Sequence, residues 1–140
     1  MRVLLCTTDK IGSRLIRAVT WSRWSHAVII DGDEIIEAVW PRVRVSPLAD
    51  ALVSHPRWVI IDIPVADESA AIAAARSQIG KPYDLWGVLG LGLKRQWQDD
   101  DAWWCSELIT WAAKQGGTDL FRPDALRRIT PEHLWMLPAA

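Results

Sequence analysis

Residues 25–39 have the sequence SHAVIIDGDEIIEAV, and this stretch indicates the fold. Two runs rich in β-branched residues flank Asp31-Gly32, which is a strong signal for a β-hairpin. Apolar runs at residues 3–7, 43–45 and 58–63 predict further strands. Helical spacing and breaker residues predict helices over residues 10–21, 46–52, 67–79, 84–97 and 106–114, a polar loop at 98–101 and one helical turn near residue 131. Helices and strands alternate without a linker, so we expect one α+β domain over residues 1–140.

The composition excludes several classes of protein. The chain is 50% hydrophobic and 24% charged with a formal net charge of -1, which is typical of a globular domain. It has no block of Lys and Arg, so we expect no nucleic-acid partner. The two cysteines are too few for a disulfide scaffold, and no Cys/His cluster has zinc-ligand spacing, so we expect neither a metal nor a cofactor.

The apolar segments are short. The N-terminal residues lack the basic start and long apolar core of a signal peptide. The longest apolar run, at residues 85–93, falls well below the roughly 20 residues that a membrane span needs. We therefore expect a soluble cytoplasmic protein, and release by a route that needs no signal stays open.

Cys105 is the candidate nucleophile. It lies at the predicted start of a helix in WWCSELITWAAKQGG, residues 103–117. The unpaired N–H groups and the dipole at a helix start favour the thiolate, which is the reactive form of cysteine. The alternative is a buried and unreactive thiol. We expect the second cysteine, Cys6, to be an inert core residue of the first strand.

A thiolate nucleophile needs a base within hydrogen-bond distance. His55 precedes a proline in SHPRW, and we expect it in a surface loop. His133, in TPEHLW, is expected to be a surface or packing residue. His26 begins a strand in front of the apolar run AVII, which makes it the candidate base. The alternative is a hydrogen-bonded histidine of the core.

Glu37 is the candidate residue that orients His26. If Asp31-Gly32 forms the turn, Glu37 lies directly opposite His26, where Cβ atoms of facing residues are about 4.5–5.5 Å apart. If Gly32-Asp33 forms the turn, Glu37 lies diagonal to His26 but on the same face. A three-residue loop without a bulge would move Glu37 to the other face. The alternative for Glu37 is an exposed strand carboxylate.

Tyr83 is a candidate oxyanion or substrate-binding residue. It lies in IGKPYDLWG, residues 79–87, where Pro82 fixes the turn that presents it. A hydroxyl placed here, 22 residues before Cys105, can help to hold a developing oxyanion. The alternative is a tyrosine that packs against the neighbouring helix.

The order His, Glu, Gly-x-Pro-Tyr and Cys-Ser-Glu-Leu, spread over residues 25–113, resembles a known family. It is similar to the circularly permuted branch of the NlpC-type papain-like cysteine hydrolases, the YiiX/YaeF-like amidases. The resemblance implies a permuted papain-like fold in which an antiparallel sheet packs against helices. It also implies that Cys105 is the nucleophile, His26 the base and Glu37 the orienting residue, and Tyr83 matches a tyrosine near the family's active site.

The implied activity is hydrolysis of an amide or ester through a thioester on Cys105. The resemblance suggests cell-wall-type peptide amides or lipid-like acyl compounds as substrates. The run at residues 85–97, apolar and then basic, is interpreted as a core or lid helix, with contact to an acyl chain or a membrane surface as the alternative. Trp at positions 86, 97, 103 and 104 flank the expected site. Two other functions stay open: a lecithin:retinol acyltransferase-like acyltransferase, and an inactive binding module with an ordinary thiol.

Overall fold

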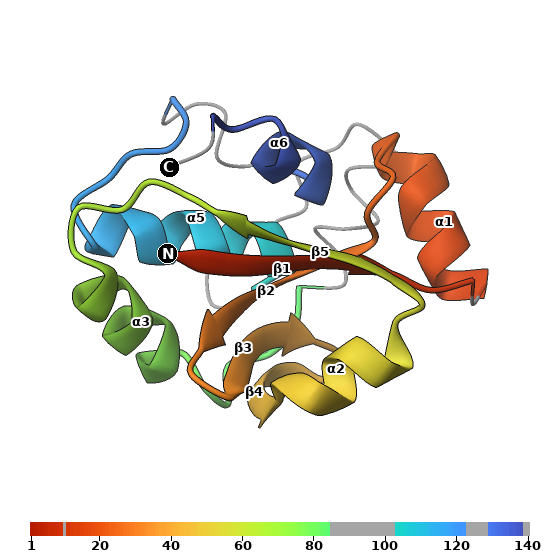
Figure 1. Cartoon of the computed structure of the whole chain (residues 1–140), viewed down its shortest axis with the longest axis horizontal. Helices are drawn as coiled ribbons and strands as arrows, with labels where there is room; N and C mark the ends of the chain where they lie inside the picture. Colours follow the sequence, from red (N-terminus) through yellow and green to blue (C-terminus); the bar gives the residue numbers. More distant parts are fainter. Residues whose placement is uncertain (10, 85–102, 123–128, 139–140) are drawn as a thin grey trace.

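The computed structural model describes residues 1–9, 11–84, 103–122 and 129–138 (Figure 1). The strands are β1 (Arg2–Thr7), β2 (His26–Asp31), β3 (Glu34–Val39), β4 (Arg42–Pro47) and β5 (Arg57–Asp62). The helices are α1 (Ile11–Thr20), α2 (Leu48–Ser54), α3 (Glu68–Ser77), α5 (Cys105–Gln115) and α6 (Pro131–Trp135). These elements confirm the sequence predictions for the described residues. The predicted helix at 84–97, the loop at 98–101, and Trp86 and Trp97 lie outside the described residues.

The strands form one five-stranded sheet in the order β4-β3-β2-β1-β5, and every neighbouring pair is antiparallel. The predicted α+β class, with an antiparallel sheet packed against helices, is confirmed. Figure 1 shows α5 running along the sheet, α2 near β4 and β3, and α1 at one end of the molecule. Within the described ranges, no helix has both the length and the apolarity to cross a lipid bilayer.

Both faces of the central strands are covered, and this explains why β1, β2 and β3 are nearly continuous apolar runs. Alternate residues of β1 and β2, among them Val3, Leu5, Ala27 and Ile29, pack against α5 and α3. Their neighbours on the opposite face, Leu4, Cys6, Val28 and Ile30, pack against α2. The centre of the sheet is therefore a fixed frame, and the ends of its strands and helices are available for a site.

Helices α3 and α5 lie in close contact at Gly116. The backbone N–H of Asp67 donates to the Gly116 carbonyl oxygen at 2.9 Å. A Cβ atom at Gly116 would lie 2.5 Å from the Asp67 carbonyl oxygen and 2.6 Å from Cγ1 of Val65. Only glycine fits here, and this contact fixes the end of α5 against the start of α3.

The β2–β3 hairpin has the second of the two predicted registers. Asp31 pairs with Glu34, so Gly32 and Asp33 form the turn, and the register based on an Asp31-Gly32 turn is wrong. Gly32 has a φ of 61°, and a type II′ hairpin turn places glycine at its first central position. Arg76 of α3 donates to both Asp31 and Glu34 at 2.7 Å, which holds the two strand ends at this turn.

Candidate active site

Cys105 is the first residue of α5, as the sequence predicts. The preceding residue, Trp104, has an extended backbone and makes no side-chain capping hydrogen bond. The first N–H groups of α5 therefore have no partner within the helix. Further along, Leu108 and Ile109 are buried against the sheet and fix the direction of the helix. The thiol of Cys105 is thus placed at the positive end of an anchored helix.

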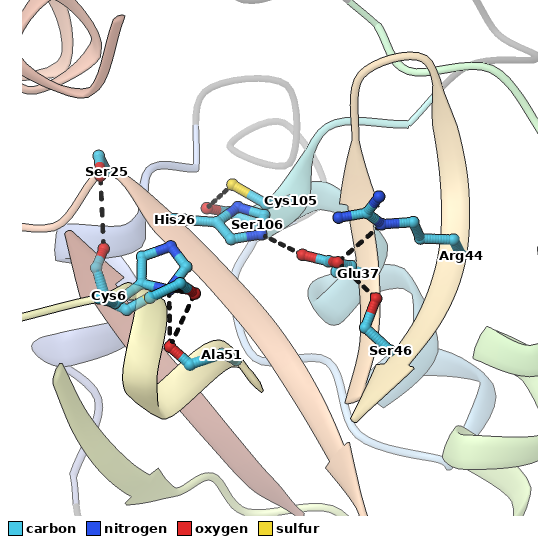
Figure 2. A network of polar contacts seen from close by, with 11 residues as sticks. Cys6, Ser25, His26, Glu37, Arg44, Ser46, Ala51, Cys105 and Ser106 are labelled. Carbon is cyan, nitrogen blue, oxygen red and sulfur yellow. Dashed lines mark hydrogen bonds and ion pairs between the residues drawn. The ribbon is translucent and has the colours of Figure 1, made fainter. Parts of the chain in front are cut away.

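The thiol of Cys105 meets the ring of His26 at the start of β2. The side chain of His26 and the backbone N–H of Ala27 both lie near enough to Sγ of Cys105 to lower the pKa of this thiol. The Ser106 hydroxyl lies 3.9 Å from Sγ of Cys105. Figure 2 shows the His26 ring between Cys105 and Glu37. The sulfur is surrounded by groups that stabilise a negative charge.

The other side of the His26 ring contacts Glu37. Nε2 of His26 lies 3.0 Å from Oε2 of Glu37. On the observed register Glu37 is opposite Val28 and so diagonal to His26, and both side chains project from the same face. Because Nε2 faces the carboxylate, the nitrogen that remains for Cys105 is Nδ1. The structure therefore places the His26 ring between Cys105 and Glu37.

The second oxygen of Glu37 is held by β4. Nε of Arg44 donates to Oε1 at 2.9 Å, and the Ser46 hydroxyl donates to the same atom at 3.0 Å. Arg44 pairs directly with Glu37 in the β3–β4 register. Sequence reasoning missed both residues. Counting outward from the short turn at Trp40 and Pro41 places Arg44 opposite Glu37, so the signal was in the sequence.

The pKa values of Cys105, His26 and Glu37 all shift in the direction that favours the charged form of the side chain. Burial favours the neutral thiol of Cys105, but the hydrogen bond and charge of His26 outweigh it and lower the pKa of this thiol. Burial would also lower the pKa of His26, whereas its hydrogen bonds to Cys105 and Glu37 raise that pKa to about 9. The pKa of Glu37 falls to about 2, because its hydrogen bonds and the charge of His26 outweigh its burial. At neutral pH the site favours thiolate, imidazolium and carboxylate.

The charge of Cys105 contributes to the pKa shifts of two nearby side chains, Cys6 and Tyr83. Burial raises the pKa of the Cys6 thiol to about 12, with a contribution from Cys105. This agrees with the expected inert core cysteine. Burial also raises the pKa of Tyr83, followed by the charges of Cys105 and Asp84. Tyr83 therefore stays protonated as a potential donor, and its part in a reaction stays a prediction.

The two other histidines have different surroundings. His133 is exposed on α6, and its Nδ1 accepts a hydrogen bond from the Thr130 backbone N–H at 3.0 Å. His55 ends α2, and its ring stacks on that of His26 with 6.4 Å between centroids. Its Nδ1 lies 2.8 Å from the Ala51 carbonyl oxygen, to which it donates. The sequence predicted a surface loop for His55 and did not indicate this contact, which depends on how α2 packs under β2.

The two described tryptophans beside Cys105 are largely packing residues. Trp104 is buried, while Trp103 packs against Trp111 and donates from Nε1 to the Gln78 side chain at 3.1 Å. Tyr83 and Trp103 also form a short parallel β-bridge. This bridge ties the segment that carries Tyr83 to the start of α5.

Comparisons with known proteins identify a similar fold. No protein-family model matches the chain, and no curated protein matches it significantly. Among solved structures, the metalloprotein YiiX from Escherichia coli O157:H7, of the family DUF1105, is similar with a TM-score of 0.64 and 20% sequence identity. The match covers 86% of this chain and 68% of that one. The chain therefore has a YiiX-like α+β fold, which agrees with the YiiX part of the sequence resemblance.

Proposed function

We propose that this protein is a cysteine hydrolase that cleaves an amide or ester through a thioester on Cys105. The observation that carries the proposal is the position of the His26 ring, which lies between Cys105 and Glu37 and is 3.0 Å from the Glu37 carboxylate. This is the arrangement of nucleophile, base and orienting group that covalent acyl transfer needs. The predicted resemblance to permuted NlpC-type hydrolases supports the same reaction.

The first half of the reaction forms the acyl-enzyme. The Cys105 thiolate, with its proton held on Nδ1 of His26, attacks the substrate carbonyl carbon, and the C–S bond forms as the carbonyl electrons move to oxygen. The intermediate then collapses, the C–N or C–O bond breaks, and His26 gives its proton to the leaving amine or alcohol. Glu37 fixes the ring and stabilises the imidazolium. A thioester on Cys105 remains.

The second half releases the acid. Neutral His26 takes a proton from water as the water oxygen attacks the thioester carbon, and collapse breaks the C–S bond. This step regenerates the thiolate and the imidazolium together with a carboxylic acid. In both halves the backbone N–H of Cys105, at the first position of α5, is the proposed oxyanion donor. Tyr83 is the proposed second donor.

The similar protein YiiX is described as a metalloprotein. In the described part of the chain, no group of three or more His, Cys, Asp and Glu side chains is arranged to hold a metal ion. Glu37 directs one oxygen at His26 and the other at Arg44 and Ser46. These residues do not fit a metal centre, and no step of the proposed reaction uses one.

The test is turnover on a panel of peptide amides and lipid esters. We expect release of the amine or alcohol by the wild-type protein and loss of that release in Cys105→Ala and His26→Ala. The matched control is Cys6→Ala, which removes the other thiol of the chain and should keep activity. Turnover that survives in Cys105→Ala, or that is lost equally in Cys6→Ala, would contradict the proposal.

Mass spectrometry of the reacting protein separates the hydrolase from the open alternatives. A hydrolase accumulates or passes through an acyl adduct on Cys105 and releases free acid. An acyltransferase transfers the same acyl group to an added amine or alcohol in preference to water. An inactive binding module forms no adduct and has a thiol with an ordinary pKa near 8.5.

A further inference from the structure

Helix α1 directs its apolar side toward solvent. Ile11 and Leu15, one turn apart and therefore on the same side, are 85% and 59% exposed. Ser13, Ile16 and Arg17 face the domain instead: Ser13 donates to the Ser25 hydroxyl at 2.7 Å, and the Arg17 side chain is only 23% exposed. A helix that packs on its own domain normally buries its large aliphatic side chains. The exposure of Ile11 and Leu15 indicates that this side of α1 contacts something outside the domain.

Trp21, directly after α1, adds a second observation. It is 91% exposed, although indole is among the most apolar side chains. Its φ is 52°, in the left-handed region that glycine usually occupies after a helix. The N–H of Ser22 donates to the Arg17 carbonyl oxygen at 3.2 Å, which closes the helix end around Trp21. A strained backbone that presents a large apolar side chain to solvent points to a function for that side chain.

The charge of the segment identifies the kind of partner. Residues 11–30 contain three arginines and no Asp or Glu, whereas the whole chain has a net charge of -1. Arg17 pairs with Asp9 and Arg23 pairs with Glu132. The exposed Arg14 forms no ion pair with any residue that the structure describes, and it lies one turn from Ile11. Exposed aliphatic side chains, a tryptophan and an unpaired cation are the features of helices that lie in the surface of an anionic bilayer.

We propose that the exposed side of α1, with Trp21, docks on an anionic lipid bilayer. The helix lies parallel to the membrane plane, Ile11, Leu15 and Trp21 enter the boundary between headgroups and acyl chains, and Arg14 contacts lipid phosphates. The Ser13–Ser25 hydrogen bond joins this helix to the residue before His26. Docking would thus hold the start of β2 near the membrane. The proposal goes beyond the proposed hydrolase and does not depend on it.

The experiment is flotation of the full chain with vesicles of phosphatidylcholine mixed with phosphatidylglycerol, compared with vesicles of phosphatidylcholine alone. We expect binding to the anionic vesicles that weakens as salt is added. Leu15→Glu should lower binding about tenfold, since it removes an apolar side chain that would enter the bilayer and adds a negative charge. Arg14→Gln should lower it about fivefold, and only on the anionic vesicles.

Two further variants separate docking from misfolding. Trp21→Gly should weaken binding and leave the melting temperature unchanged or higher, because glycine adopts a positive φ without strain. Val53→Glu changes an apolar residue of α2 that is 88% exposed, and it should bind vesicles like the wild type. Circular dichroism and thermal unfolding of each variant identify any that fail to fold.

Three results would overturn the proposal. One is the absence of wild-type binding to anionic vesicles, and another is equal binding to both kinds of vesicle. The third is a wild-type dimer in light scattering that Leu15→Glu dissociates, combined with vesicle binding that this variant leaves unchanged. That last result would assign the exposed side of α1 to a second copy of the chain.

Discussion

Glu37 contacts His26 from a diagonal position, with 3.0 Å between Oε2 and Nε2, and not from the position directly across the hairpin. Neighbours on the diagonal of an antiparallel pair are about 7–8 Å apart at the backbone, a distance that a glutamate can span and an aspartate spans less easily. The longer side chain also lets the second oxygen reach Arg44 and Ser46. The length of Glu37 is therefore part of the geometry of the site.

The pH dependence of thiol alkylation tests the charge state of Cys105. Because His26 and the Ala27 N–H lower the pKa of this thiol, we expect alkylation of Cys105 to persist well below pH 8. His26→Ala should move the profile up toward the ordinary range. Peptide mapping by mass spectrometry assigns the label, and Cys6, with a pKa near 12, should stay unlabelled in the folded protein. A profile that His26→Ala leaves unchanged would contradict this account.

Glu37→Gln tests the negative charge of the orienting residue. Gln keeps an oxygen that accepts from His26 but loses the charge that raises the pKa of the ring. We expect the NMR titration of His26 to shift to lower pH and the alkylation rate of Cys105 near neutral pH to fall. Glu37→Asp is the matched variant: it keeps the charge but shortens the reach, and it should lower activity with a smaller change in the His26 titration.

The free energy of unfolding should depend on pH through the ion pair of Glu37 and His26. The pKa of Glu37 falls from 4.5 to about 2 on folding, so its contribution is present above pH 4.5 and is lost as the pH falls toward 2. The pKa of His26 rises from 6.5 to about 9, so its contribution is present below pH 6.5 and is lost as the pH rises through 9. In urea unfolding, Glu37→Gln should lower the free energy of unfolding by about 2 kcal/mol at pH 6 and by less than half of that at pH 3. An equal cost at both values would argue against the charged pair.

Arg44→Met tests how far β4 supports the site. Losing the donor to Oε1 leaves Ser46 as the second contact of that oxygen, so Glu37 should be less well fixed and its pKa should rise. We expect kcat to fall several-fold with a small change in KM, since Arg44 acts through Glu37. Arg42→Met, in the same strand, is the control. A loss confined to KM would place Arg44 in substrate binding instead.

Gly116→Ala tests the contact between α3 and α5. A methyl group at this position has no room beside the Asp67 carbonyl and the Val65 side chain. We expect a loss of about 1–3 kcal/mol in the free energy of unfolding. Gly80→Ala is a useful comparison, because its penalty comes from a positive φ in open space and not from a clash. A fully stable Gly116→Ala protein would show that the two helices separate easily.

Much of the fold could be predicted because its signals are local. The hairpin, the strand pattern and the helix start at Cys105 each depend on neighbouring residues. The choice between two hairpin registers was not decided by sequence, since both fit the run Asp-Gly-Asp and only the turn geometry at Gly32 separates them. Both registers place Glu37 on the same face of the sheet as His26, so the prediction that Glu37 orients His26 did not depend on the choice between them.

The missed features depend on long-range packing. His55 stacks on His26 because α2 returns beneath β2, and no spacing in the sequence indicates that path. The exposure of Ile11 and Leu15 was also not predicted, since a periodic apolar pattern predicts a helix but not which side of it meets the domain. Arg44 is different: the short turn after β3 contained enough information to place it opposite Glu37.

The wide separation of the site residues has a practical consequence. Cys105 lies 68 positions after Glu37 and 79 after His26, so its acidic thiol exists only while β2, β3 and α5 are packed together. Cys6 has the opposite property, because the fold suppresses its ionisation and unfolding restores it. In mildly acidic solution, denaturant should therefore slow the labelling of one cysteine and accelerate that of the other. The ratio of the two labelling rates therefore reports the folded fraction without an introduced cysteine or fluorophore.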